Sequence, residues 1–115
     1  MNPEKFLPLP QATFHILLAL IDEDRHGYAI IQDIEARTGG KLRLSAGTLY
    51  RSIQRMVEQD LILETDERPA AEFDDERRRY YRVTGLGRRV AKAEAGRLLQ
   101  LVDQARALGV IATGV

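Results

Sequence analysis

Residues 45–53 read SAGTLYRSI and open the segment that is most informative about the fold of this 115-residue chain. Ser45 is a good helix N-cap, and the pattern after it predicts a helix that continues to about Gln59. At 100° per residue, one side of this helix carries an apolar stripe that is typical of a core-facing surface. The stripe consists of Ala46, Leu49, Ile53, Met56 and Val57.

The opposite arc of the same helix carries short polar groups and two arginines one turn apart. It consists of Gly47, Thr48, Arg51, Gln54 and Arg55, with Tyr50 at its border. Small residues let a helix backbone approach phosphates, which the helix dipole favours, and arginine can bind the O6/N7 edge of guanine in a bidentate way. This arc therefore indicates a helix that enters a DNA major groove; a plain amphipathic surface helix is the alternative.

Two helices are predicted before this segment. The first spans Gln11–Asp22, and its apolar residues cover most of the helix surface, so we expect it to be buried on several sides. Residues 24–27 form a predicted turn, and a second helix follows from Tyr28 to Arg37, ended by two glycines. Residues 41–44 alternate as a short extended segment would.

A β-hairpin with a long loop is predicted after the third helix. Residues 61–65 and 77–83 have strand composition, and residues 66–76 contain a proline and many acids, as a loop would. Alternation along the second strand places Tyr81 and Val83 toward the core.

Thr84 then caps a final helix that runs to about Leu108. The order of elements predicts a mainly α fold with a small β-hairpin: a winged helix-turn-helix plus a long C-terminal helix. We expect residues 1–83 to form the winged helix-turn-helix DNA-binding domain. Residues 84–115 would form a dimerisation helix and tail.

The charges are segregated along the chain although the formal net charge is zero. Residues 36–57 hold five basic and no acidic residues, residues 58–76 hold nine acids and one arginine, and residues 77–92 hold seven basic and no acidic residues. Nucleic acid responds to the local field rather than to the total charge. We therefore add Ser45, Lys41 and Arg43, and the strand residues Arg77, Arg78 and Arg79, to the candidate DNA contacts.

The final helix carries more apolar surface than three short helices can cover, so part of it is expected to bury against a second copy of the chain. The predicted dimer interface consists of Val90, Ala91, Ala95, Leu98, Leu101, Val102, Ala105 and Leu108. Packing wholly within one chain is the alternative.

Several function classes lack support in the sequence. There is no cysteine, which excludes disulfides and thiolate sites, and no apolar stretch is long enough to span a membrane. His15 reads as a core or boundary residue and His26 as a turn cap. We expect no metal, no cofactor and no enzymatic activity, and a soluble cytoplasmic, nucleoid-associated protein.

Three short motifs in order resemble the PadR family of prokaryotic transcriptional regulators: HGY at 26–28, SAGTLYRSI at 45–53 and RYYRVTGLGR at 79–88. The resemblance implies a homodimer that binds double-stranded operator DNA, usually represses, and often releases DNA when a small-molecule effector binds. The single C-terminal helix is similar to the short subfamily. Ser45, Thr48, Tyr50 and Arg51 match the recognition-helix signature, and residues 77–79 match the basic wing strand. The acidic run before Arg77 departs from the pattern.

A winged-helix protein-interaction module that does not bind DNA is the alternative function. It would explain the fold and the dimer equally well, and the acidic wing loop better. Such a module should present apolar anchors at the positions of Arg51 and Arg55, where the sequence has two cations instead.

Overall fold

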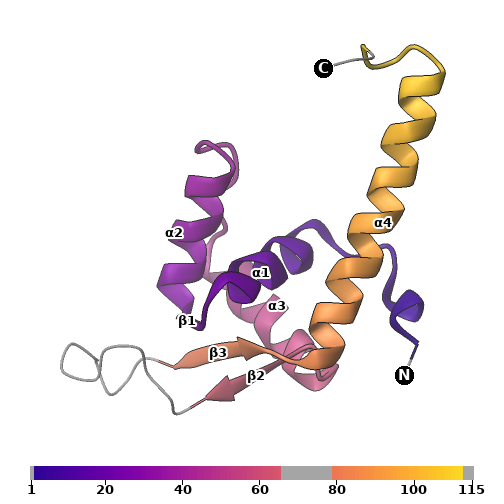
Figure 1. The fold of residues 1–115 in the computed structure, drawn as a ribbon. Coiled ribbons are helices and arrows are strands. Elements are labelled where there is room, and N and C mark those ends of the chain that lie inside the picture. Colours follow the sequence, from indigo (N-terminus) through magenta and orange to yellow (C-terminus); the bar gives the residue numbers. More distant parts are fainter. Residues whose placement is uncertain (1, 66–78, 113–115) are drawn as a thin grey trace.

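The computed structural model describes residues 2–65 and 79–112 of the protein. It confirms the predicted mainly α fold, in which three α-helices precede a β-hairpin and a long final helix (Figure 1). The elements are η1 (Pro3–Phe6), α1 (Gln11–Asp22), β1 (Arg25–His26), α2 (Gly27–Arg37), α3 (Ala46–Glu58), β2 (Ile62–Thr65), β3 (Tyr80–Val83) and α4 (Gly85–Ala107).

Helix α1 lies at the centre of the molecule and packs against α2, α3, β3 and α4. Ile16, Leu17 and Leu20 are almost completely buried, as expected for a helix that is apolar on most of its surface. Leu18 is the exception, since it stays exposed. The prediction that this helix is buried on several sides is therefore confirmed.

The segment between α1 and α2 was predicted to be a turn, and this prediction is wrong for Arg25 and His26. These residues form β1, which pairs antiparallel with β3, so that the sheet order is β1-β3-β2. Two residues are too short for an alternation pattern, and a strand of this kind exists only because β3 offers it an edge. His26 also fills the predicted capping role, because its Nδ1 accepts a hydrogen bond from the Ala29 amide at 3.2 Å.

The β2–β3 hairpin forms the wing, with Ile62 opposite Val83 and Glu64 opposite Tyr81. Tyr81 and Val83 are buried, as the alternation predicts, and burial raises the pKa of Tyr81. Within the described residues β3 begins at Tyr80, and Arg79 directly precedes it. The predicted loop over residues 66–76 lies outside the described residues, as do Arg77 and Arg78.

Helix α4 begins directly on the base of the hairpin. Thr84 caps it by accepting a hydrogen bond from the Gly87 amide at 2.9 Å, and the Thr84 amide donates to the Leu61 carbonyl at 3.1 Å. A Cβ at Gly87 would overlap that Leu61 carbonyl oxygen and approach Val83 Cγ2. The helix can therefore dock here only because position 87 has no side chain.

We expect Gly87→Ala to destabilise the fold by about 1–3 kcal/mol, because the added methyl group overfills the junction between hairpin and helix. Thermal and urea unfolding of the purified protein would measure the loss. Gly85→Ala is the matched control, since its nearest neighbour would be the flexible end of Arg89 at 3.5 Å. Equal stability of the two variants would contradict the steric argument.

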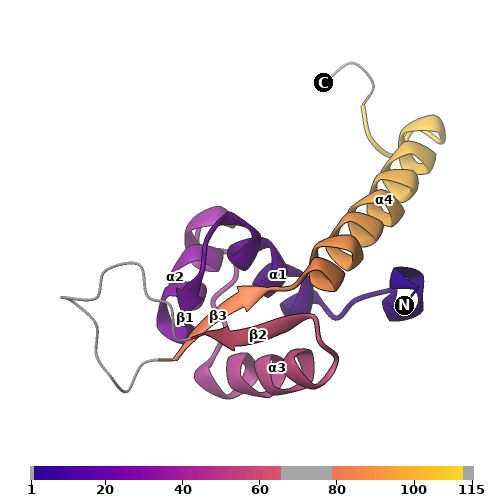
Figure 2. The same ribbon diagram turned by 60° about the horizontal axis from the view of Figure 1, so that its bottom comes forward.

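A buried carboxylate fastens the N-terminal segment to α4. Glu94 is 2% exposed, accepts a hydrogen bond from the Leu9 amide at 3.0 Å, and pairs with Arg97 at 2.5 Å. The hydrogen bond from Arg97, aided by that from Leu9, outweighs burial and lowers the pKa of Glu94. Figures 1 and 2 show the result: η1 lies on one side of α4 and the sheet on the other.

Because the pKa of Glu94 is lowered on folding, its charge contributes stability that is present at neutral pH. This contribution is lost as the pH falls below the ordinary glutamate value of about 4.3 and through the lowered pKa. We expect Glu94→Gln to cost about 1–3 kcal/mol at pH 7. The difference from wild type should shrink toward pH 3 in urea titrations; a difference that is independent of pH would contradict an ionic role.

The two halves of α4 differ in their surroundings. Val90 and Ala91 are buried in the chain's own core, whereas beyond Arg97 no residue of the helix is buried. Figure 1 shows this second half projecting away from the body of the molecule. No helix in the described residues is both long and apolar enough to cross a membrane.

Candidate nucleic-acid interface

The predicted third helix exists as α3, and its cap is the expected one. Ser45 Oγ accepts a hydrogen bond from the Thr48 amide at 3.1 Å. No acid lies in the first turn of α3, so the positive end of the helix dipole is not neutralised from within the helix. Its N-terminal end is thus electrostatically suited to an anion.

The inner face of α3 is narrower than predicted. Leu49, Ile53 and Met56 are buried, whereas Ala46 and Val57 at the edges of the predicted stripe are exposed. Three residues spaced four and three apart suffice to dock the helix on α1 and β2. The rest of its circumference is left open to solvent.

The outer arc of α3 is exposed almost as the sequence predicts. Gly47, Arg51, Gln54 and Arg55 are exposed, and Thr48 is half-buried. The Arg51 guanidinium lies over Gly47, where a Cβ would come within 3.1 Å of Nη1. Within the described residues, neither Arg51 nor Arg55 forms an ion pair, so both charges are available to a ligand.

Tyr50 was expected at the border of this arc and is half exposed. Its ring lies against Gly27, the first residue of α2. The contact is so close that a Cβ on Gly27 would overlap the tyrosine hydroxyl. A side chain at position 27 would therefore displace the Tyr50 ring. The sequence analysis did not predict this contact between Gly27 and Tyr50. The one signal in the sequence was that Gly27 is part of the HGY motif.

Lys41 and Arg43 lie in the segment between α2 and α3, which is not part of the sheet. Both side chains are exposed, while Leu44 between them and the helix is buried, in line with the predicted alternation. Arg43 donates to Glu35 at 2.6 Å, and this hydrogen bond raises its pKa. A ligand at Arg43 would therefore compete with a carboxylate, whereas Lys41 makes no ion pair with any described residue.

Of the three DNA contacts predicted on the wing, Arg79 is the one that lies within the described residues, and it directly precedes β3. It is exposed and lies 3.5 Å from Glu64 Oε1 on β2. Arg82, which follows on the strand, forms two hydrogen bonds with Asp24, at 3.0 and 2.7 Å. The structure thus places Arg79 beside the exposed arc of α3, because Glu64, Arg79 and Tyr50 line one hollow.

A second hollow of about 180 Å³ lies where the N-terminal end of α1 meets α3. Its lining residues are Pro10, Thr13, Thr48, Arg51, Ser52 and Arg55. We call it the α1–α3 cleft. Pro10, Thr13 and Ser52 are not among the DNA contacts predicted from the sequence. The sequence does not place them here, because the cleft depends on the angle at which two helices cross.

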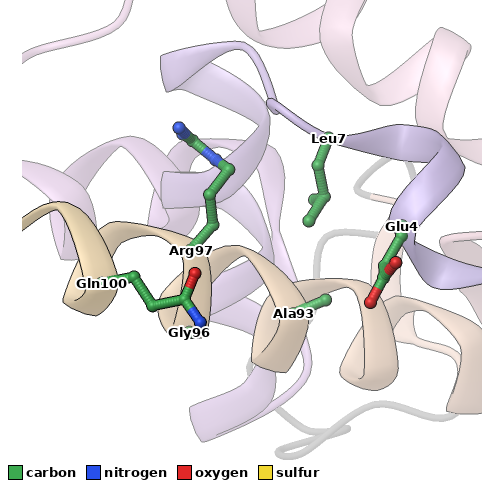
Figure 3. Close-up of a pocket in the computed structure, with 6 residues that line it drawn as sticks. All are labelled: Glu4, Leu7, Ala93, Gly96, Arg97 and Gln100. Carbon is green, nitrogen blue, oxygen red and sulfur yellow. The ribbon is translucent and has the colours of Figure 1, made fainter.

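A third hollow, of about 490 Å³, lies between η1 and the middle of α4 (Figure 3). Its lining residues are Glu4, Leu7, Ala93, Gly96, Arg97 and Gln100. It belongs to the face of α4 that carries the N-terminal segment, on the other side of the helix from the sheet. The described residues contain no group of three or more histidines or acids that could bind a metal ion.

Comparison with known proteins gives a family. The model of the transcriptional regulator PadR-like family matches residues 16–93. An uncharacterised protein of Lysinibacillus sphaericus is 34% identical over 73 residues, and the match spans 64% of this chain and 64% of that relative's length.

Two solved structures extend the likeness to the fold. A transcriptional regulator from Clostridium thermocellum is 26% identical with a TM-score of 0.69, over 87% of this chain and 90% of that one. A PadR family transcriptional regulator from Eggerthella lenta is 27% identical with a TM-score of 0.62, over 81% and 79% of the two chains. The residues that the family model matches, 16–93, run from the centre of α1 to the middle of α4 and include the whole of α3. The chain therefore belongs to the PadR-like family of transcriptional regulators.

Proposed function

We propose that this regulator binds double-stranded operator DNA as a homodimer, with α3 of each copy in the major groove. The observation that carries the proposal is the exposed arc of α3, where Arg51 and Arg55 extend from the helix without an ion-pair partner in the described residues. Solvent-exposed cations one turn apart would bind phosphates or guanine edges. An apolar docking surface would present anchors at these positions.

The two arginines differ in their distance from the N-terminal end of α3. Arg51 lies one turn from the N-terminal end of α3, the end that enters the groove in helix-turn-helix proteins, and is the better candidate for reading a base. Gln54 can contact a base edge or the backbone. Arg79, which lies beside the arc, and Lys41, in the segment that leads into α3, would contact phosphates. Arg77 and Arg78, which lie outside the described residues, would do the same.

We expect Arg51→Ala to weaken binding to the operator by about 1–3 kcal/mol and to lower the preference over random DNA. Fluorescence anisotropy with the DNA upstream of the protein's own gene, over a salt series, would measure both quantities. The wild-type affinity should fall with salt with a log–log slope of about −0.9 for each phosphate contact.

The matched control is Arg106→Ala, because Arg106 lies near the far end of α4, paired with Asp103. It should bind as wild type does. Absence of binding to any duplex at low salt would contradict the proposal and favour a protein-interaction module. Equal discrimination by the Arg51 variant and wild type would remove α3 from the reading role.

The homodimer is proposed because the core-facing side of α4 continues past the body of the molecule. In the first half of the helix this side is covered by the chain itself, at Val90 and Ala91, which are therefore not part of the proposed interface. In the second half the same side is exposed, apart from the half-buried Ala105. We call it the α4 stripe: Ala95, Leu98, Leu101, Val102, Ala105 and Leu108.

Apolar surface of this extent favours a self-complementary contact between two α4 helices about a two-fold axis. Alanine at two of the six positions allows the helices to approach closely. A two-fold dimer that suits DNA would hold two α3 helices about 34–36 Å apart, one helical turn of the duplex. Repression and release by a small-molecule effector, which the family resemblance implies, stay predictions, as does action at the nucleoid in the cytoplasm.

We expect Leu101→Glu to raise the dissociation constant of the dimer by about 100-fold or more, since each dimer would bury two unpaired carboxylates. Sedimentation velocity at several protein concentrations would measure it. Gln100→Glu adds the same charge on the other face of α4, beside the hollow between η1 and the middle of α4, and should leave the dimer intact. A wild-type monomer at tens of micromolar, or dimers of equal strength in both variants, would refute this interface.

A further inference from the structure

The α1–α3 cleft brings together two features that are far apart in the sequence. One is the N-terminal end of α1, at Pro10 and Thr13, and the other is the face of α3 that carries Thr48, Arg51, Ser52 and Arg55. These four α3 positions are spaced by three, one and three residues, so they lie along one side of the helix. The cleft therefore faces solvent beside the surface proposed to bind DNA.

The end of α1 supplies free backbone donors. Its N-cap is Pro10, which makes no side-chain capping hydrogen bond, and no acid lies in the first turn. The first amides of an α-helix have no partner within the helix, and here no side chain compensates for them. Together with the helix dipole, they make this end attractive to an anion.

Thr13 provides an independent indication that something binds here. The residue is 6% exposed and lines the cleft, and its side chain makes no hydrogen bond to any described residue. A buried hydroxyl without a partner loses its hydrogen bonds to water and gains none in return. This cost is avoided when a ligand or a water in the cleft bonds to the hydroxyl.

Arg55 supplies the positive charge that the cleft needs. Arg51 lies against Gly47 and Thr48, near the N-terminal end of α3, with its Nη2 3.5 Å from Thr48 Oγ1. Arg55 lies one turn further along, at the end of the set of residues that line the cleft. Backbone amides, hydroxyls and a guanidinium form the donor set that recognises a tetrahedral oxyanion.

We propose that the α1–α3 cleft binds one phosphodiester group of the DNA backbone and thereby fixes the position of α3 in the groove. The inference rests on the proposed DNA-binding function and deepens it. Thr13 and the first amides of α1 would donate to the phosphate oxygens, and Arg55 would neutralise the charge. Such a contact carries no base information, so it should contribute equally to all DNA sequences.

Random-sequence duplex DNA at low salt is the probe that isolates this contact, since it needs no operator. We expect Arg55→Gln to weaken binding and to reduce the magnitude of the salt slope by about 0.9, the value for one phosphate contact. Thr13→Val should weaken binding roughly tenfold without a change in slope, because it removes a hydrogen bond to a charged acceptor but no charge. Arg106→Gln is the control and should match wild type.

Thr13→Ser keeps the hydroxyl and should restore binding, which separates hydrogen bonding from a packing defect. Melting temperatures of all variants would show that each is folded. If wild type binds random DNA and both Thr13→Val and Arg55→Gln bind it equally well, the proposal is overturned, while the DNA-binding function stands.

Titration with inorganic phosphate, followed by amide NMR, separates the two possible sources of the anion. Shifts at the Ala12 and Thr13 amides in wild type that disappear in Arg55→Gln, together with the DNA result above, support a phosphodiester site. The same shifts in a protein that binds no DNA would overturn both the phosphodiester proposal and the proposed function, and would leave a site for free phosphate.

Discussion

The burial of α1 on nearly every side is the constraint on which the rest of the structure depends. Ile16, Leu17 and Leu20 are almost completely buried, and the helix that carries them packs against α2, α3, β3 and α4. A helix covered on most sides cannot shift against one neighbour without disturbing another, because protein interiors are close-packed. Helices α2 and α3, strand β3 and the first half of α4 are thereby held in one rigid unit (Figure 2).

This rigidity explains how a short helix such as α3 can present a surface of defined geometry. Only Leu49, Ile53 and Met56 anchor α3, and they leave most of its circumference exposed. The fixed position of α3 against α1 also creates the α1–α3 cleft, whose lining comes from both helices. A surface that reads DNA through side chains gains from such preorganisation, because less conformational freedom is lost on binding.

Local patterns in the sequence predicted most of the fold, and long-range contacts account for what they missed. Ser45 and Thr84 begin their helices as the capping rules predict, since a cap depends only on the next three residues. Strand β1 was missed because its two residues are extended only in the presence of β3. The buried Glu94 and the cleft residue Thr13 were missed for the same reason: their surroundings come from segments that are distant in the sequence.

The same reasoning explains why α4 misled the interface prediction in its first half. A helical stripe records only that one side of a helix is apolar, and does not say whether the chain itself or a second copy covers it. Val90 and Ala91 share this stripe with Leu98 and Leu101, but the body of the molecule ends between the two pairs. One side of α4 is buried in the core of its own chain at one end and exposed at the other. In a dimer, the first half of each α4 would belong to the rigid unit of its own chain, and the second half would contact the partner's α4. The distance between the two α3 helices would then depend on the angle at which the two α4 helices cross.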